Sequence, residues 1–243
     1  MNSGIPAALF RSSAALDPAR PFITFYDDAT GERVELSFAT FENWVSKTAN
    51  LIQDGLVAEP GQRISLLLPV HWQTLVWYLA CWSAGVTAAP GLDPAAADHV
   101  ITAGESLARA QACPGDRVLM SLRPFGGRSL ESLPAGVLDY AVEVPGYGDR
   151  FAPMRPVSPG DRALEIDGRT WTGAELVAAA EEAGVGLSST DRILTGADPA
   201  TWAGLGTVLL GPLAAGASVV LCRNLDPARI DARTTMERIT RTA

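Results

Sequence analysis

Residues 60–90 read PGQRISLLLPVHWQTLVWYLACWSAGVTAAP, and the order of elements in this stretch decides the fold. Residues 64–68 form a continuous apolar run of strand length, which is typical of a strand buried on both faces. Residues 72–84 predict a helix that Gly85 ends, and residues 86–89 predict the next strand. A strand, a helix and a strand in this order favour an α/β fold with a mostly parallel sheet and helices on its faces.

The same order of landmarks occurs twice along the chain. Arg63-Ile64, Ala84-Gly85-Val86 and Leu92-Asp93-Pro94 correspond to Arg192-Ile193, Ala215-Gly216-Ala217 and Leu225-Asp226-Pro227. This repetition predicts two pseudo-symmetric subdomains, which we place at residues 1–156, including a connector, and at residues 157–243. The alternative is that any two strand–helix–strand units share this turn chemistry.

Other elements follow from turn and cap signals. Two short hairpins are predicted, at residues 22–36 and at residues 163–171, the second with an Asp167-Gly168 turn. Thr172 and Glu175 have the spacing of a capping box that opens a helix. The middle segment, residues 93–159, is harder to interpret, and we expect strands at 117–122 and 140–144 there.

Composition excludes several classes of protein. The chain has 243 residues, of which 47% are hydrophobic and 19% charged, a balance typical of globular proteins. Its net charge of -8 argues against binding to nucleic acid or to an anionic membrane surface, which require basic faces. No apolar run is long enough to span a membrane. Three widely spaced cysteines indicate no disulfide framework and favour a cytoplasmic location.

Motifs for chemistry are scarce. The only lysine, Lys47, follows no glycine-rich phosphate loop, and neither a nucleophile elbow nor zinc-ligand spacing occurs. Asp27-Asp28 and Glu181-Glu182 are expected to be solvated surface pairs. We therefore assign no catalytic residue and no metal ligand. His71 follows the strongest buried strand, where parallel sheets form ligand sites, so it is either a substrate-binding residue or an ordinary helix-start residue.

A resemblance to a known family carries more information than these motifs. It rests on residues 36–41 (LSFATF), 60–69 (PGQRISLLLP), 79–86 (LACWSAGV), 191–194 (DRIL), 211–221 (GPLAAGASVVL) and 225–227 (LDP). In this order they resemble the N-terminal portion of the acyl- and aryl-adenylate-forming (AMP-binding, acyl-CoA synthetase-like) superfamily, and in particular short actinobacterial homologues. The resemblance implies two mostly parallel sheets flanked by helices, and it implies ATP or AMP and CoA as ligands.

The sequence departs from this family at the places where the family binds its ligands. After residues 163–166 the family has a phosphate loop that ends in Pro-Lys-Gly, whereas this chain has DGRTWTG at 167–173. Arg169, Thr170 and Thr172 are the groups there that could replace the loop as a cofactor-binding site. The family's aromatic–histidine element falls on Ala200-Thr201, so its histidine is absent. The stretch that contains Thr201 and Trp202 aligns with the edge of the family's acyl pocket, and these two residues join His71 as candidate substrate-binding residues. The family's adenine-, ribose- and metal-binding motifs and its C-terminal domain lie beyond the position that corresponds to residue 243.

Three hypotheses for function stay open, and so does the question of whether the chain is an enzyme. The first is a catalytically degenerate homologue, a pseudoenzyme that binds a partner protein or a small acyl or nucleotide ligand. The second is an active carboxylate-activating ligase, alone or completed by a second chain. The third is a self-associating module, such as a homodimer, that binds no ligand and has Trp72, Trp77 and Trp82 as candidate contact residues.

Overall fold

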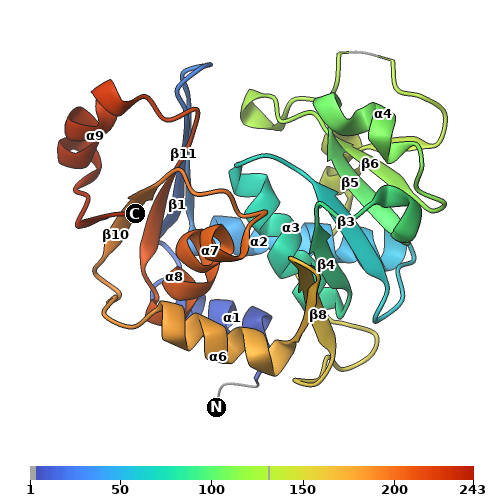
Figure 1. Ribbon diagram of the computed structural model, residues 1–243, viewed down its shortest axis with the longest axis horizontal. Coiled ribbons are helices and arrows are strands. Elements are labelled where there is room, and N and C mark those ends of the chain that lie inside the picture. The colour runs from blue at the N-terminus through green and yellow to red at the C-terminus, as the bar shows by residue number, and fades with distance from the viewer. Residues whose placement is uncertain (1–3, 131) are drawn as a thin grey trace.

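Two mostly parallel sheets form the framework of the computed structural model, which describes residues 4–130 and 132–243 (Figure 1). Within these residues, one sheet contains β12 (Arg241–Thr242), β10 (Arg192–Thr195), β11 (Ser218–Arg223), β1 (Pro21–Asp27) and β2 (Glu32–Ser37), in this spatial order. The other contains β7 (Val137–Asp139), β6 (Arg117–Met120), β5 (His99–Ala103), β3 (Arg63–Leu67), β4 (Thr87–Pro90), β8 (Arg162–Ile166) and β9 (Arg169–Thr172). The predicted fold class is confirmed.

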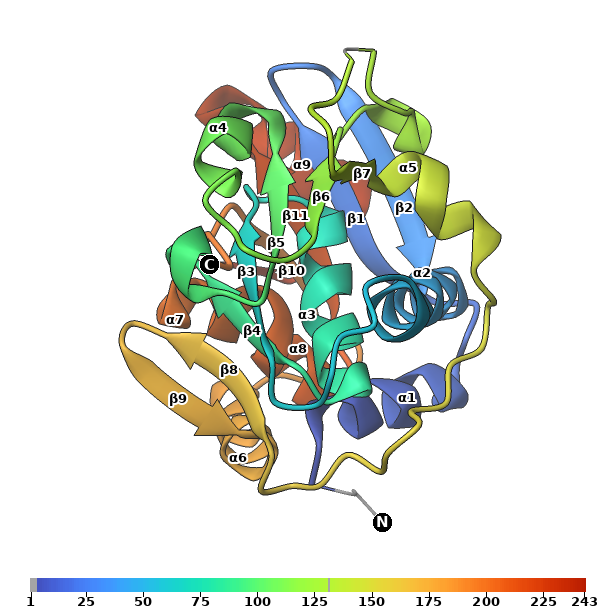
Figure 2. The same cartoon turned by 90° about the vertical axis from the view of Figure 1, so that its right-hand side faces the viewer.

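Helices surround both sheets (Figures 1 and 2). They are α1 (Pro6–Leu16), α2 (Phe38–Asn50), α3 (Trp72–Ala84), α4 (Leu107–Ala110), α5 (Tyr140–Glu143), α6 (Gly173–Ala183), α7 (Trp202–Leu205), α8 (Gly211–Ala215) and α9 (Ile230–Glu237). One π-helical turn, Leu51–Gly55, extends α2, and another, Gly206–Leu210, joins α7 to α8.

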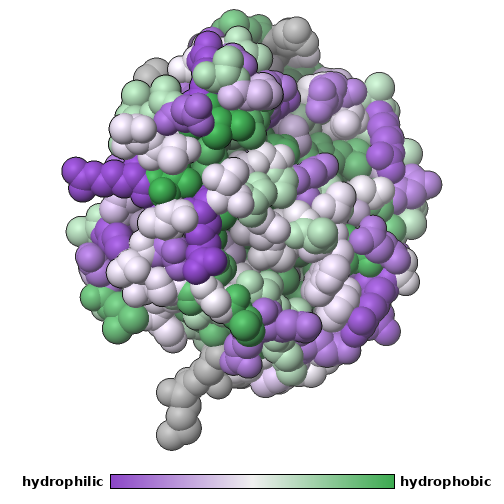
Figure 3. All heavy atoms as spheres, turned by 60° about the vertical axis from the view of Figure 1, so that its left-hand side comes forward, coloured by the Kyte–Doolittle hydropathy of each residue, from purple (hydrophilic) through white to green (hydrophobic). Residues whose placement is uncertain are grey.

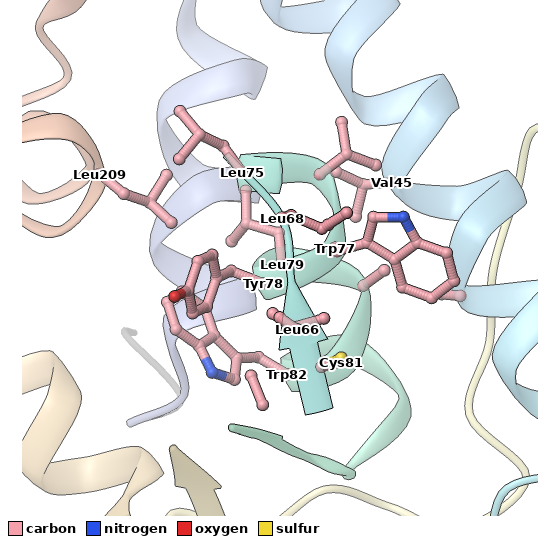
Figure 4. Close-up of a cluster of buried hydrophobic side chains, with 14 of the residues drawn as sticks. Val45, Leu66, Leu68, Leu75, Trp77, Tyr78, Leu79, Cys81, Trp82 and Leu209 are labelled. Carbon is pink, nitrogen blue, oxygen red and sulfur yellow. The ribbon is translucent and has the colours of Figure 1, made fainter. Parts of the chain in front are cut away.

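The helix α3 lies at the centre of the core, between the two sheets (Figure 1). Every one of its 13 residues is buried, as expected for a helix that is apolar on all sides. Leu66 and Leu68 from the β3 segment, Val45 from α2 and Leu209 from the second π-helical turn surround it (Figure 4). Both halves of the chain therefore pack on one helix.

Three of the four buried aromatic side chains of α3 also have partners for their polar atoms. Tyr78 Oη donates to Pro199 O at 2.8 Å, Trp82 Nε1 to Ala163 O at 2.9 Å, and Trp77 Nε1 contacts Met120 Sδ at 3.2 Å. Burial overturns the expectation that Trp72, Trp77 and Trp82 supply an exposed contact surface, because their exposed fractions are 5%, 0% and 1%. On the face shown in Figure 3, apolar side chains gather in separate patches among polar ones.

The two sheets repeat the same arrangement of strands. In each sheet an antiparallel hairpin, β1–β2 or β8–β9, pairs in parallel with the second strand of a strand–helix–strand unit, β11 or β4. Each hairpin, however, joins the unit made by the other half of the chain. The expected boundary between residues 156 and 157 therefore does not separate the sheets, because each sheet takes strands from both sides of it.

The predicted landmarks occupy equivalent places in the two halves. Arg63 and Arg192 begin β3 and β10. Gly85 and Gly216 end the helices that follow, with φ angles of 74° and 66°, which an L side chain rarely adopts. Asp93 and Asp226 then each cap a short 3-10 helix through the side chain.

Local predictions succeeded except in the middle segment. Asp167 and Gly168 both have positive φ (51° and 73°), as a type I′ hairpin turn requires, and Thr172 and Glu175 form the predicted capping box. The strand expected at residues 140–144 is wrong. Asp139 Oδ1 accepts a hydrogen bond from the Ala141 amide at 3.0 Å, which starts α5, and the strand β7 lies just before it.

Two further features bear on the class of protein. None of the helices in the described ranges is long and apolar enough to cross a membrane. Cys81, Cys113 and Cys222 are buried and form no disulfide.

Candidate functional site

The predicted cofactor-binding residues lie on β9, the outer strand of the second hairpin, and two of the three are occupied by local contacts. Arg169 Nη2 lies 3.3 Å from Glu175 Oε1, and its guanidinium carbon lies 3.4 Å from the centre of the Trp171 ring. Thr172 Oγ1 accepts from the Glu175 amide and donates to Glu175 Oε2. Thr170 is exposed on the same strand.

Glu175 holds this group together. Its carboxylate accepts from the Thr172 amide at 2.8 Å and from the Thr172 hydroxyl at 3.0 Å. These hydrogen bonds, followed by the contact with Arg169, keep the pKa of Glu175 below its usual value. The carboxylate therefore stays ionised at neutral pH and neutralises the only cation among the predicted cofactor-binding residues.

A stack of two indoles joins this hairpin to α7. The Trp171 and Trp202 rings are 3.9 Å apart and inclined by only 11°. The guanidinium of Arg169 also lies within 4 Å of the Trp171 ring centre, so Arg169 and Trp202 occupy opposite faces of that ring. The fold thus brings Arg169 and Trp202 together through a residue, Trp171, that the sequence analysis did not single out.

Thr201 has a structural role beside Trp202. Its hydroxyl accepts from the Gly204 amide at 3.1 Å and donates to Asp198 O at 2.9 Å, so it caps α7. Among the described residues, no hydrogen bond or ring contact joins Thr201 or Trp202 to His71. The three predicted substrate-binding residues therefore do not form one contact cluster.

His71 caps α3 and is itself enclosed. Its Nδ1 accepts from the Gln73 amide at 3.2 Å, and the Phe25 ring lies edge-on at 4.5 Å. Burial first, and the charge of Arg223 second, lower the pKa of His71 to about 3, so the imidazole is neutral. Because Nδ1 accepts, the proton is on Nε2, and within the described part of the chain this N–H has no hydrogen-bond partner.

The residues of the β8–β9 hairpin do not fit a bound nucleoside triphosphate. A phosphate cradle needs several free backbone amides or cations that converge on one point. Here the turn between β8 and β9 contains only Asp167 and Gly168, and the Arg169 and Thr172 side chains already have partners. In addition, no group of three or more His, Cys, Asp or Glu residues in the described ranges could hold a metal ion.

A buried ionic cluster under α9 was missed in the sequence. Asp28 was expected to be solvated, but its side chain is 3% exposed and its Oδ1 lies 2.5 Å from Arg233 Nη2. The hydrogen bond from Arg233 is the main cause that holds the pKa of Asp28 below its usual value. Asp27 is also buried and accepts from the Asn224 side chain at 2.8 Å. The spacing of these residues in sequence gives no signal for the pairing, because Arg233 is 205 positions from Asp28.

Comparison with known proteins gives consistent matches. The family model described as "AMP-binding enzyme" matches residues 10–112. A curated protein of Mycobacterium tuberculosis (strain ATCC 25618 / H37Rv), described as "TIGR03089 family protein", is 42% identical over 234 residues, which cover 93% of this chain and 92% of that protein.

Solved structures share the fold. The acyl-CoA synthetase of Brucella canis matches with a TM-score of 0.78 and 18% identity over 96% of this chain. The N-terminal domain of FACL13 from Mycobacterium tuberculosis matches with a TM-score of 0.76 and 16% identity over 98% of this chain. The chain spans 46% and 62% of the lengths of these two solved chains.

Proposed function

We propose that this chain, which belongs to the TIGR03089 family within the AMP-binding superfamily, acts by binding a partner protein or a small ligand. We propose further that it does not adenylate a carboxylate. The hairpin of β8 and β9 gives the strongest support for this proposal. It runs through a two-residue turn at the place where the resembling enzymes have their phosphate loop.

The electrostatics of this hairpin also argue against adenylation. Phosphoryl transfer requires cationic or N–H donors aimed at the charge that develops in the transition state, and each such donor contributes about 3–4 kcal/mol. Arg169 directly follows the turn in the sequence, and it is paired with Glu175 and stacked on Trp171. An arginine already neutralised by a carboxylate offers a phosphate little net charge.

The state of the cysteines supports a proposal for the compartment. Cys81, Cys113 and Cys222 are buried and unpaired, although a secreted protein of this size commonly uses its cysteines in disulfides. This pattern supports a reducing, cytoplasmic location for the binding function that we propose.

The test is an exchange assay between labelled pyrophosphate and ATP. The purified chain and its Arg169→Ala variant would be assayed with a panel of short, long and aromatic carboxylic acids, with a complete acyl-CoA synthetase as the positive control. We expect both proteins to match the protein-free blank. Exchange above the blank that disappears in Arg169→Ala would overturn the proposal and favour an active ligase.

Two additions separate the remaining hypotheses. Repeating the assay with the products of neighbouring genes tests the alternative in which a second chain completes the enzyme. Thermal unfolding with ATP, AMP or CoA identifies a small ligand, because binding to the folded state alone raises the melting temperature. We expect any such shift to be the same in Arg169→Ala as in the natural chain.

A further inference from the structure

A groove separate from the β9 and α7 residues lies between α1, α2 and the connector. Its volume is about 390 Å³, within the range of about 300–1,000 Å³ that is usual for small-molecule sites. The apolar walls come from Phe10 of α1, Val45 of α2, Leu79 of α3 and the half-buried Phe151 of the connector. The groove therefore offers an apolar body of a ligand a surface on several sides.

The connector wall of the groove is fixed to α2 by polar contacts. Lys47 Nζ donates to Tyr147 O at 2.6 Å and pairs with Asp149 Oδ1 at 2.9 Å. Asn50 Nδ2 donates to Gly148 O at 3.0 Å and to Arg150 O at 2.9 Å. The only lysine of the chain thus holds the wall in place, and the groove is built before any ligand arrives.

The charges at the rim favour an anion. Arg11 and Arg150 line the groove, and neither side chain forms an ion pair or a hydrogen bond within the described ranges. Asp149 is neutralised by Lys47, which leaves Glu42 as the one lining carboxylate without a cationic partner there. The rim therefore has one net positive charge in a chain whose net charge is -8.

A hydroxyl in the groove is free to bind a ligand. Ser46 is 8% exposed and lines the groove, yet its Oγ makes no hydrogen bond with any described residue. The oxygen is not fully enclosed, so a molecule in the groove can reach it. An oxygen in a bound molecule can therefore accept a hydrogen bond from this hydroxyl.

We propose that this groove binds a small amphiphile, a molecule with an apolar body and one anionic group. The body lies against Phe10, Val45 and Phe151. The anionic group takes charge-assisted hydrogen bonds from Arg11 and Arg150 and a further hydrogen bond from Ser46 Oγ. A binding role of this kind requires no contribution from the β8–β9 hairpin. It can therefore be true or false independently of the proposal that the chain does not adenylate a carboxylate.

Calorimetric titration with two probes of equal chain length tests the proposal. Octyl sulfate has the predicted anionic group, and octyltrimethylammonium has a cation on the same tail; both are used below their micelle concentrations. The variants are Arg11→Ala combined with Arg150→Ala, and Ser46→Ala. The control is Arg128→Ala, which removes an exposed arginine that does not line the groove.

We expect octyl sulfate to bind the natural chain and Arg128→Ala with the same Kd, and octyltrimethylammonium to bind neither. The double arginine variant should bind octyl sulfate about tenfold more weakly or worse, and Ser46→Ala several-fold more weakly. Equal affinity across all variants, equal binding of the two probes, or no binding of octyl sulfate would each overturn the proposal. So would a dimer in sedimentation that the double arginine variant abolishes, because the groove would then belong to a second copy. Circular dichroism confirms that each variant is folded.

Discussion

The neutral, buried imidazole of His71 should give the chain a dependence on acid that one substitution removes. In the folded protein the ring is 2% exposed, and burial holds its pKa at about 3. In the unfolded chain a histidine has a pKa of about 6.5. The unfolded state therefore binds a proton throughout the range between these two values, and the folded state does not.

The sign and size of the effect follow from linkage. Because the folded pKa is depressed, the stabilising contribution is complete above about pH 6.5 and decreases as the pH falls from there toward 3. The decrease approaches about 1.4 kcal/mol for each pH unit once the unfolded histidine is mostly protonated, so between pH 6.5 and pH 4.5 it amounts to about 2 kcal/mol. Asp28, whose folded pKa is also lowered, adds its own loss mainly below about pH 3.9, the ordinary pKa of an aspartate, which lies outside this window.

Urea unfolding at pH 7.5, 6.5, 5.5 and 4.5 measures this dependence. His71→Asn keeps a side-chain oxygen that can cap α3 but removes the titrating ring, so its free energy of unfolding should change about 2 kcal/mol less between pH 6.5 and pH 4.5. The control, Phe25→Leu, alters the packing against the same ring. It should lower stability at every pH and keep the natural slope. If His71→Asn keeps that slope as well, the imidazole is not the neutral, buried group described above.

Two further substitutions test the indole stack and a strained residue. Trp202→Ala should lose about 2–3 kcal/mol of unfolding free energy and the near-ultraviolet circular dichroism signal of the paired indoles. Trp202→Phe should keep most of the stability. Equal stability of Trp202→Ala and the natural chain would mean that the stack does not hold the hairpin. Val57→Gly should raise the free energy of unfolding by about 0.5–1 kcal/mol, and with it the thermal midpoint, because Val57 is 70% exposed and has a φ of 51°, which strains a β-branched residue. A lower midpoint would show that the valine side chain makes a stabilising contact.

Elements with local signals could be predicted from the sequence. Trp72–Ala84 was predicted to the residue, because its apolar residues lie on every side and Gly85 marks its end. The β8–β9 hairpin followed from Asp167-Gly168 in the same way. In contrast, β5 and the Asp139 cap of α5 lie in a segment where strand and helix signals are short, so one strand was missed and another misplaced.

Contacts between distant segments could not be predicted. Nothing near Trp171 indicates that Trp202 will stack on it, and nothing near Asp28 indicates Arg233. The candidate residues Arg169 and Thr172 could be chosen from their position, but their engagement by Glu175 became visible only in the structure. The groove depends on three helices and a connector, and it therefore has no motif of its own.

The exchange of hairpins between the two sheets has a consequence for synthesis on the ribosome. Ile23 of β1 pairs with Val219 of β11, which is 196 positions further along the chain. At about 5–20 residues per second, a ribosome needs roughly 10–40 s to make the intervening stretch. During this time β1, whose residues Phe22, Ile23 and Phe25 are fully buried in the finished protein, can pair with β2 on one edge, but its other edge has no partner strand. The nascent chain therefore exposes an unpaired, aggregation-prone strand edge for most of its translation. We expect the yield of folded protein in cells to depend on chaperones that bind such edges.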